Sequence, residues 1–426
     1  MKKILASILA ASLMAGAVSA CKGETDPGEQ VIPDRIVDAP MSAELRELDD
    51  SENEQYRRAY LNTAFDLLRN KTGNGTNVMI SPASIMIALS MAEAGAHGTT
   101  RDQMAALWGG QQDSDGQLSY AAELLDRLNS SEGVSMHAAD SMWINQQILA
   151  GVLKDDYVDF VRDNYDSEVN MLDLDDAALD RINGWVDENT DGMIDKIIDS
   201  FEPDTAMMLL NAIAFDGSWQ QQYEEHQVHD GTFRNSDGTE SDVTMLHSEE
   251  GLYLENDDAT GFIKFYEGCQ YAFVVMLPKD EDCDADSFLA DFTGDDFNGF
   301  MDSQTYEYQV FATLPEFEYD YGDSFAGTLR DLGMTDAFSP AGADLTGIAE
   351  LEDGNLYIGD VIHKTHIEVD SAGTRAAAVT AVSIRATGAM IGDDNIRRVE
   401  CDRPFAYAIV DTTDNTPVFI GTVNNL

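Results

Sequence analysis

The residues whose types and spacing could do chemistry lie in one late segment, 368–390, which reads EVDSAGTRAAAVTAVSIRATGAM. Gly373 permits a hinge near its start. The stretch that follows, 374–387, contains no glycine, proline or acidic residue, although the rest of the chain is rich in acids. A segment with this composition can pair as a strand, or it can be offered to another molecule and then pair as a strand.

Side chains alternate along this stretch. Every second residue from Thr374 to Ile384 is small or apolar, whereas the intervening residues include Arg375 and Arg385. Because the side-chain period of a strand is two, one face can be buried while the other faces water. Small residues at the start suit tight insertion into a sheet. An ordinary sheet strand explains the same pattern, so the segment alone leaves both interpretations open.

Familiar enzyme motifs are absent. The chain has no G-x-S-x-G elbow, no H-E-x-x-H, no phosphate-loop lysine motif and no paired C-x-x-C. The acids of DEDCDAD at 280–286 alternate as in a calcium loop, but the turn glycine and closing glutamate are missing, so we interpret this stretch as a solvated acidic turn. The seven histidines show no ligand spacing. We therefore predict no catalytic residue, no metal site and no cofactor.

The first residues resemble the leader of a bacterial lipoprotein. Lys2 and Lys3 precede an apolar stretch, 4–18, that is too short to be a permanent membrane span. It ends in Val-Ser-Ala-Cys, the pattern of a lipobox, in which the cysteine thiol takes the lipid. We expect 1–20 to be a signal peptide and Cys21 to anchor the mature protein outside the cytoplasm, in the outer membrane or at the cell surface. The alternative is an ordinary secretory leader, which would release the protein.

A tether and a single large domain are predicted to follow. Residues 21–51 combine prolines and glycines with scattered acids, which is typical of a flexible linker, and 52–426 would be the domain. An oxidising compartment permits a disulfide among Cys269, Cys283 and Cys401. An extended run between the first two would hold them too far apart, which favours a bond involving Cys401. Three free thiols remain the other possibility.

The charge balance excludes several classes of partner. The chain has 25 Lys and Arg against 79 Asp and Glu, a formal net charge of −54. A field of this sign repels phosphate and sulfate, so we expect no nucleic acid, no heparin and no contact with acidic membranes except through the lipid. A hydrophobic fraction of 43% is still enough to build a core.

The elements that must position these residues mix helix and strand. Helical spacing of apolar residues predicts helices over 56–69, 82–93 and 180–198, the last broken at Asp191 and Gly192. The strand-like runs are 207–215, 262–265, 271–277, 306–314, 405–410 and 418–423. The last two are joined by a turn-rich connection that predicts a hairpin. The pattern indicates an α+β fold with large antiparallel sheets.

Several stretches, in the same order along the chain, resemble the serpin family. They are NVMISPASIMIALSMAEAGAHGTT (77–100), INGWVDENTDGMI (182–194), LLNAIAFDGSW (209–219), GADLTGI (342–348), HKTHIEVDSAGTRAAAVTAV (363–382) and RPFAYAIVDTTDNTPVFIGTVNNL (403–426). The resemblance covers residues 55–426. It implies three β-sheets, about eight to nine helices and an exposed reactive-centre loop at about 371–402.

The resemblance also implies an activity. In this family a protease cleaves the loop and forms an acyl-enzyme, after which the loop inserts into the central sheet and traps the protease. We therefore expect a monomeric suicide inhibitor rather than an enzyme. Its targets would be serine proteases, with cysteine proteases as a second class. A non-inhibitory serpin that serves as a binding or carrier protein is the alternative.

Family motifs assign roles to individual positions. The hinge would be formed by Gly373, Thr374, Ala376, Ala377 and Ala378, and the region where the sheet opens by Ser81, Ser84, Asn211 and His363, with Trp219 near the point where insertion begins. The common family register places cleavage between Thr387 and Gly388, which suits elastase-like or subtilisin-like proteases. A shorter register places it between Arg385 and Ala386, which suits trypsin-like proteases, and Met390 is a third option.

Two positions depart from the family pattern. Ser371 stands where the family usually has a glutamate two residues before the hinge glycine, and Asp370 precedes it. A salt bridge that holds the loop closed would then be missing or shifted. Arg375 replaces a frequent glutamate, and the alternation predicts that it faces water and is tolerated.

Overall fold

The computed structural model describes residues 43–111, 113–130, 133–147, 151–201, 205–351, 355–374 and 395–426. Several predicted positions lie outside the described residues, among them Cys21 and the leader. The hinge residues Ala376, Ala377 and Ala378 also lie outside, as does every candidate for the cleaved bond: Arg385, Ala386, Thr387, Gly388 and Met390. Within the described residues, no helix combines the length and the apolar character needed to cross a membrane.

Nine α-helices occur in the described part of the chain. They are α1 (Asp50–Lys71), α2 (Pro82–Ala94), α3 (Gly98–Leu107), α4 (Ser114–Asn129), α5 (Asp155–Tyr165), α6 (Asp176–Asn189), α7 (Ala285–Leu289), α8 (Gly294–Asp302) and α9 (Ala326–Asp331). The prediction for α2 is confirmed, because Pro82 is its first residue and Ser81 is its N-cap.

The helix predicted over 180–198 differs from α6 at both ends. It starts earlier, because the side chain of Asp175 accepts hydrogen bonds from the backbone N–H groups of Ala177 and Ala178 and so caps the first turn. The predicted break is confirmed: α6 ends at Asn189, because Asp191 and Gly192 adopt positive φ angles of 51° and 70° that stop the helical ladder. The residues that follow, up to 198, are not helical.

Three large sheets carry the fold. Sheet A has the order β12 (Phe317–Ser324), β14 (Asp360–Val369), β15 (Gly373–Thr374), β5 (Met207–Ser218), β2 (Val134–Asn145) and β4 (Glu168–Leu172). Sheet B has the order β1 (Val78–Ile80), β18 (Thr416–Val423), β17 (Phe405–Asp411), β10 (Tyr271–Pro278), β9 (Ala259–Phe265) and β8 (Leu252–Glu255). Sheet C has the order β16 (Ile396–Glu400), β11 (Gln309–Pro315), β7 (Glu240–Glu250) and β6 (Val228–Arg234). A small additional pair joins β13 (Ala349–Leu351) to β3 (Gly151–Leu153).

The expectation of antiparallel sheets is only partly correct. β17 and β18 form the predicted hairpin, and most other pairs are antiparallel. Three pairs are parallel, however: β14 with β5, β2 with β4, and β11 with β16. Parallel neighbours need a crossover instead of a tight turn. One such crossover contains α5, which lies between β2 and β4 in the chain and which the sequence analysis did not predict.

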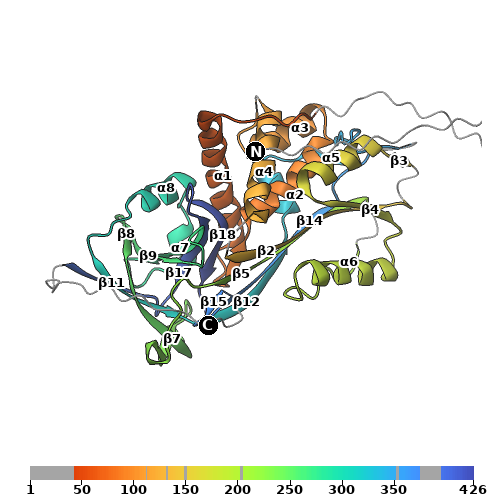
Figure 1. Cartoon of the computed structure of the whole chain (residues 1–426). Helices are drawn as coiled ribbons and strands as arrows, with labels where there is room; N and C mark the ends of the chain where they lie inside the picture. Colours follow the sequence, from red (N-terminus) through yellow and green to blue (C-terminus); the bar gives the residue numbers. More distant parts are fainter. Residues whose placement is uncertain are drawn as a thin grey trace, which may run out of the picture. The chain divides into compact units, whose positions relative to one another are not determined.

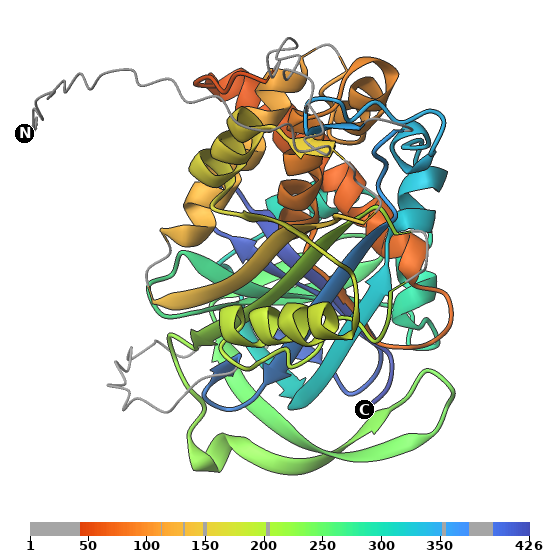
Figure 2. The same ribbon diagram turned by 90° about the vertical axis from the view of Figure 1, so that its right-hand side faces the viewer.

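Helices cover sheet A on both sides. In Figure 1, α2 to α5 lie on one side of β2 and β4, and α6 lies on the other side. All residues of α2 are buried. Figure 2 shows α6 lying across the outer face of sheet A, where Val186 packs against Ala212 and Ala214 of β5. The strands of sheet A therefore have a buried inner face toward α2 and an outer face that α6 covers only in part.

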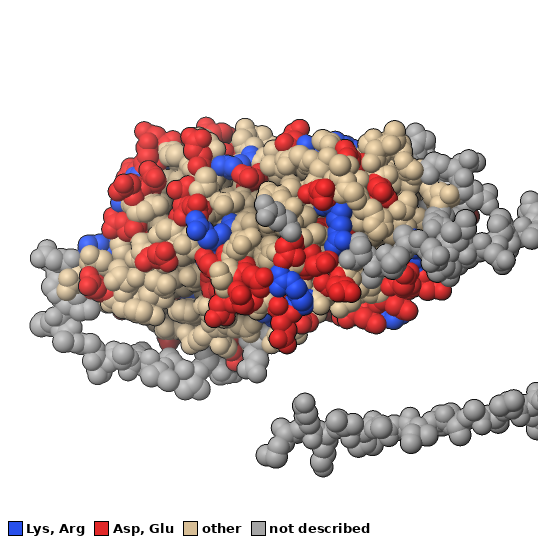
Figure 3. Space-filling view, turned by 90° about the horizontal axis from the view of Figure 1, so that it is seen from above, with Lys and Arg blue, Asp and Glu red and all other residues tan. Residues whose placement is uncertain are grey.

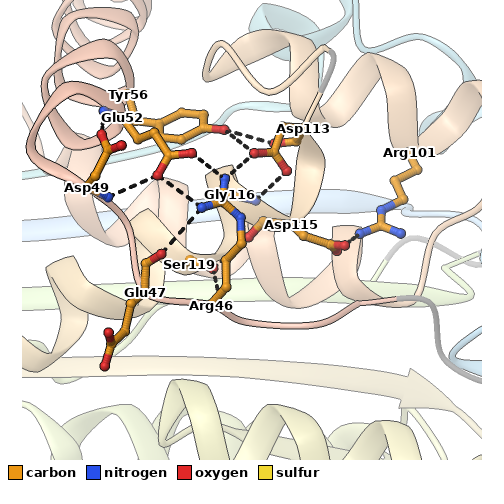
Figure 4. Close-up of polar contacts among 10 residues, drawn as sticks. All are labelled: Arg46, Glu47, Asp49, Glu52, Tyr56, Arg101, Asp113, Asp115, Gly116 and Ser119. Atoms are coloured by element: carbon orange, nitrogen blue, oxygen red, sulfur yellow. Dashed lines mark hydrogen bonds and ion pairs between the residues drawn. The ribbon is translucent and has the colours of Figure 1, made fainter.

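The residues before α1 pack against α4. Ala43 is buried, and the backbone N–H of Arg46 donates to the Ser119 hydroxyl at 2.9 Å. The Arg46 guanidinium also pairs with the carboxylates of Glu52, at 2.8 Å, and Asp113 (Figure 4). This part of the range predicted as a tether therefore lies against the domain, because its apolar and polar groups both find partners there.

Candidate functional site

The centre of sheet A is closed along most of its length by direct pairing of β14 with β5. These strands pair in parallel from Asp360 opposite Met208 to His366 opposite Ala214. Beyond that point the short strand β15 lies between them: it is antiparallel to β5, with Thr374 opposite Gly217, and it also pairs with Val369 of β14. Two residues of the predicted hinge thus already occupy the gap at one end of the sheet.

Thr374 is anchored inside the molecule. Its side chain is only 1% exposed, and its hydroxyl lies 2.6 Å from the hydroxyl of Tyr266, the residue that follows β9 of sheet B. This burial agrees with the alternation in the sequence, which places Thr374 on the face that would be buried. The next residue of the same face lies outside the described residues.

Trp219, at the end of β5, holds the turn that leads into β15. Its indole Nε1 donates to the carbonyl of Asp370 at 2.9 Å, and its backbone N–H donates to the carbonyl of Ala372 at 2.9 Å. The ring stacks on Tyr266, with centroids 4.6 Å apart. Trp219 therefore lies where the resemblance places it, at the entrance to the gap between β5 and β14.

Asp370 stabilises this turn without a salt bridge. Its carboxylate accepts hydrogen bonds from the backbone N–H groups of Ala372, at 2.7 Å, and Gly373, at 2.9 Å. In the described part of the chain neither Asp370 nor Ser371 forms an ion pair. The charged group near this turn is instead the carboxylate of Glu316. Partial burial and the nearby Asp370 carboxylate raise the pKa of Glu316.

The four residues predicted at the opening of the sheet meet in one buried cluster. The backbone N–H of Ser81 donates to Nε2 of His363 at 3.0 Å, and Nδ1 of His363 contacts the side-chain oxygen of Asn211. The side-chain amide nitrogen of Asn211 in turn donates to the Ser84 hydroxyl. The cluster therefore links the start of α2 to β14 and β5, the two strands that pair at the centre of the sheet.

These contacts define the state of the imidazole. Because Nε2 accepts a hydrogen bond from Ser81, the proton of the neutral ring lies on Nδ1, where it is donated to Asn211. Burial, and to a lesser degree the positive charge of Lys71, lower the pKa of His363 to about 3. His363 is thus a neutral hydrogen-bonding group at neutral pH.

One member of this cluster, Asp140 on β2, was not predicted from the sequence. Its carboxylate accepts a hydrogen bond from the Asn211 amide and one from the Ser84 hydroxyl at 3.3 Å. Burial raises the pKa of Asp140 to about 7, and the hydrogen bonds from Asn211 and Ser84 offset only part of this rise. The signal that could have found it is an acid within the otherwise uncharged run AADSMWI. Its partner is fixed only by the register, which sets Asp140 opposite Asn211.

The interpretation of 280–286 as a solvated acidic turn is correct for its exposed first residues, 280–282, but two later acids have structural partners. The Asp284 side chain caps α7 by accepting from the Ser287 N–H, and the buried Asp286 carboxylate accepts from the N–H groups of Gly73 and Gly75. The expected disulfide is not formed, because Cys269, Cys283 and Cys401 are all free thiols. The alternative of three free thiols therefore holds, and Cys401 is buried in the core.

Comparisons with known proteins agree with this architecture. A family model described as serpin (serine protease inhibitor) matches residues 58–426. An uncharacterized serpin-like protein of Thermococcus kodakarensis is 30% identical over 366 residues, covering 85% of this chain and 83% of that protein. Iripin-3 of Ixodes ricinus is 29% identical, covering 83% of this chain and 90% of its own.

Solved structures add a comparison of conformations. The thermophilic serpin tengpin in its native state is similar with a TM-score of 0.82 at 35% identity, covering 90% of this chain and 96% of that one. The same protein in its latent state gives a TM-score of 0.75 at 32% identity, covering 90% and 100%. Human thyroxine-binding globulin, at 23% identity and a TM-score of 0.77 over 88% and 99%, shares the fold.

Proposed function

The chain belongs to the serpin family, and we propose that it inhibits proteases as a suicide substrate whose loop, after cleavage, inserts into sheet A between β5 and β14. Serpins are in general protease inhibitors and not enzymes, and the fold described above is the serpin fold. The proposal concerns the finer points: the mechanism in this chain, the residues that carry it and the proteases that it traps.

One observation carries the proposal: β15 lies between β14 and β5 at the end of sheet A where their direct pairing stops. The cleaved loop would continue from Thr374 in the same direction, antiparallel to both neighbours. To do so it must separate the seven residue pairs that join Asp360–His366 to Met208–Ala214. A strand that has already entered the gap needs no further search for the insertion site.

The free energy available is sufficient to drive this change. About a dozen new ladder hydrogen bonds at about 1 kcal/mol each, together with buried apolar surface, give on the order of 10 kcal/mol. This is comparable to the stability of a whole domain, so the uninserted form must be held by a kinetic barrier. The stretch 374–387 contains no acid or proline that would oppose insertion.

The cluster of His363, Asn211, Ser81, Ser84 and Asp140 forms part of that barrier in our proposal. The contact between His363 and Asn211 crosses the pair of strands that must part. Insertion would break this contact and expose polar groups that are buried now, which costs free energy before the new strand has formed. A buried hydrogen-bonded cluster with no gating role is the alternative, and the two differ in their effect on the lifetime of the active form.

The class of protease that is inhibited would depend on which bond of the loop is cleaved. Cleavage between Thr387 and Gly388 would serve elastase-like or subtilisin-like proteases, and cleavage between Arg385 and Ala386 would serve trypsin-like proteases, with Met390 as a third site. The surface seen in Figure 3 carries many more acidic than basic side chains, as the net charge of −54 requires. The loop segment 374–387, with two arginines and no acid, would be a contrasting feature on such a molecule.

The test is direct trapping. The purified chain is mixed with trypsin, elastase, subtilisin and papain, and the products are separated on denaturing gels. We expect an SDS-resistant complex with at least one of these proteases, and mass spectrometry of the released peptide identifies the bond. Cleavage of the loop with full protease activity remaining would contradict inhibition and favour a non-inhibitory carrier serpin.

The proposal also covers where the protein acts in the cell. We propose that Cys21 carries lipid and that the chain acts as a monomer outside the cytoplasm, at the cell envelope. The supporting observations are the lipobox pattern and the apolar leader in the sequence. The anchor would keep the inhibitor at the surface where foreign or self-secreted proteases act.

A further inference from the structure

Two carboxylates and an imidazole meet on the outer face of sheet A, at its edge. Glu318 of β12 and Glu368 of β14 are register partners, and His366 lies two residues from Glu368 on the same face of β14. One potential ligand atom from each of these residues lies within 4.8 Å of the other two. This is the spacing of ligands around a single ion, and it comes from three side chains on two paired strands.

A fourth side chain orients the imidazole. Nδ1 of His366 lies 2.8 Å from the carboxylate of Asp320, its register partner on β12. The side chain of His366 is only 12% exposed, whereas that of Asp320 is 61% exposed. A carboxylate on one ring nitrogen fixes the ring and raises the basicity of the other nitrogen, as in many histidines that bind metals. Nε2 is thereby left as the nitrogen that can bind an ion.

The two glutamates lack a compensating charge in the part of the chain that the structure describes. Neither Glu318 nor Glu368 forms an ion pair with a lysine or arginine there. Like charges directly opposite each other on antiparallel strands destabilise the pair. A bound cation would relieve this repulsion, and the nearby Asp320 adds to the negative field that attracts it.

We propose that Glu318, His366 and Glu368 bind a divalent transition-metal cation, of which Zn²⁺ is the representative. Two carboxylate oxygens and one imidazole nitrogen are ligands that Zn²⁺ accepts, with water in the remaining position. The nitrogen ligand disfavours Ca²⁺ and Mg²⁺, which prefer oxygen alone. This site is hard to find from the sequence, because β12 and β14 are distant in the chain and the spacing of His366 and Glu368 reflects only the period of a strand.

The location of the site predicts what the ion would do. β12 and β14 are paired over eight residues, from Phe317 opposite Val369 to Ser324 opposite Ile362. Loop insertion would open the sheet on the other side of β14, toward β5, and would leave this pair intact. The ion would therefore stabilise the uninserted and inserted forms against unfolding alike and would leave inhibition unchanged. That last point rests on the proposed function, whereas binding of the ion does not.

Titration of ZnCl₂ into the purified full-length chain, followed by calorimetry, tests the proposal. We expect saturable binding of one ion, with affinity reduced at least about tenfold in His366→Gln and in Glu368→Gln. CaCl₂ should bind at least about tenfold more weakly than ZnCl₂. A matched control is His229→Gln, which removes one ring of the His229–His247 pair on sheet C, where the ring centroids lie 5.4 Å apart. This control should keep the affinity of the native chain.

Thermal unfolding gives a second measurement that does not depend on calorimetry. ZnCl₂ should raise the Tm of the native chain and of His229→Gln, but not that of Glu318→Gln. Without metal, Glu318→Gln should unfold at the same or a higher temperature than the native chain, because it removes repulsion from Glu368. Any of three results would overturn the proposal. They are the absence of saturable ZnCl₂ binding to the native chain, an affinity of His366→Gln and Glu368→Gln equal to that of the native chain, and loss of binding in His229→Gln.

Discussion

The imidazole of His363 on β14 contacts the side-chain amide of Asn211 on β5, and the two residues are register partners in the strand pair that closes the centre of sheet A. In the row of partners across the sheet, Asn211 is also opposite Asp140 of β2. One buried row of polar side chains thus joins three neighbouring strands. Any separation of β14 from β5 must break this row at His363.

Replacement of His363 tests whether the row sets the lifetime of the active form. His363→Ala leaves the Ser81 N–H and the Asn211 amide oxygen without their partner, which costs about 1–3 kcal/mol for each buried group. We expect a lower Tm and faster loss of inhibitory activity during incubation at elevated temperature, because spontaneous insertion meets a lower barrier. The control is His226→Ala, whose side chain is 73% exposed. An activity half-life equal to that of the native chain would contradict the gating role.

Asp140 predicts a pH dependence of stability. Its pKa is about 7 in the folded chain against an ordinary value of 3.8, so between these values the folded state holds a proton that the unfolded state has released. The stability contributed by this proton is therefore full below about pH 4 and is lost as the pH rises toward 7. Over the same window the low pKa of His363, about 3, acts in the opposite direction, and buried Glu93, with a pKa raised by burial to about 8, acts in the same direction.

Comparison with Asp140→Asn isolates this contribution. The variant keeps an oxygen that can accept from Asn211 but has no proton to release. We expect its stability relative to the native chain to increase with pH between about 4 and 7, by up to about 1.4 kcal/mol per pH unit, and to level off above 7. Urea unfolding at a series of pH values measures this difference. A difference that does not change with pH would show that Asp140 is ionised or protonated alike in both states.

The sequence predicted the parts of the site that lie in continuous motifs. The resemblance to the family assigned Ser81, Ser84, Asn211, Trp219 and His363, and the structure brings all of these to the centre or the entrance of sheet A. The family resemblance was needed to connect them, because periodicity alone describes strands without saying which strands are neighbours.

The remainder depends on register and on partners that a single strand does not reveal. Asp140 joins the cluster only because β2 pairs with β5 in the register that sets it opposite Asn211. Glu318 meets His366 and Glu368 only because β12 pairs with β14. The parallel pairs of sheet A were missed for a similar reason: crossovers are settled by tertiary contacts rather than by local apolar spacing.

The lipid anchor is tested by one substitution. Cys21→Ser removes the thiol that the proposed lipidation requires, so we expect the chain to move from the membrane fraction to the soluble fraction of the cells that express it. Cys269→Ser is the control, because Cys269 is a half-buried free thiol within the domain, and this variant should stay with the membranes. An unchanged membrane fraction for Cys21→Ser would favour another mode of attachment or an ordinary secretory leader.

The hinge provides the most direct test of insertion. Thr374 is 1% exposed between β14 and β5, with its hydroxyl bonded to Tyr266 at 2.6 Å. Because Thr374 is already buried in the uninserted form, Thr374→Arg would displace β15 from the gap, and insertion would then have to bury a charged side chain, which costs several kcal/mol. The protease should then complete hydrolysis before it is trapped, so the number of inhibitor molecules consumed per inhibited protease should rise at least about tenfold. Thr374→Ser, which keeps the hydroxyl and the small size, should inhibit as the native chain does. Gel analysis of both variants measures trapping against cleavage, and an undiminished SDS-resistant complex with Thr374→Arg would show that insertion does not proceed through β15.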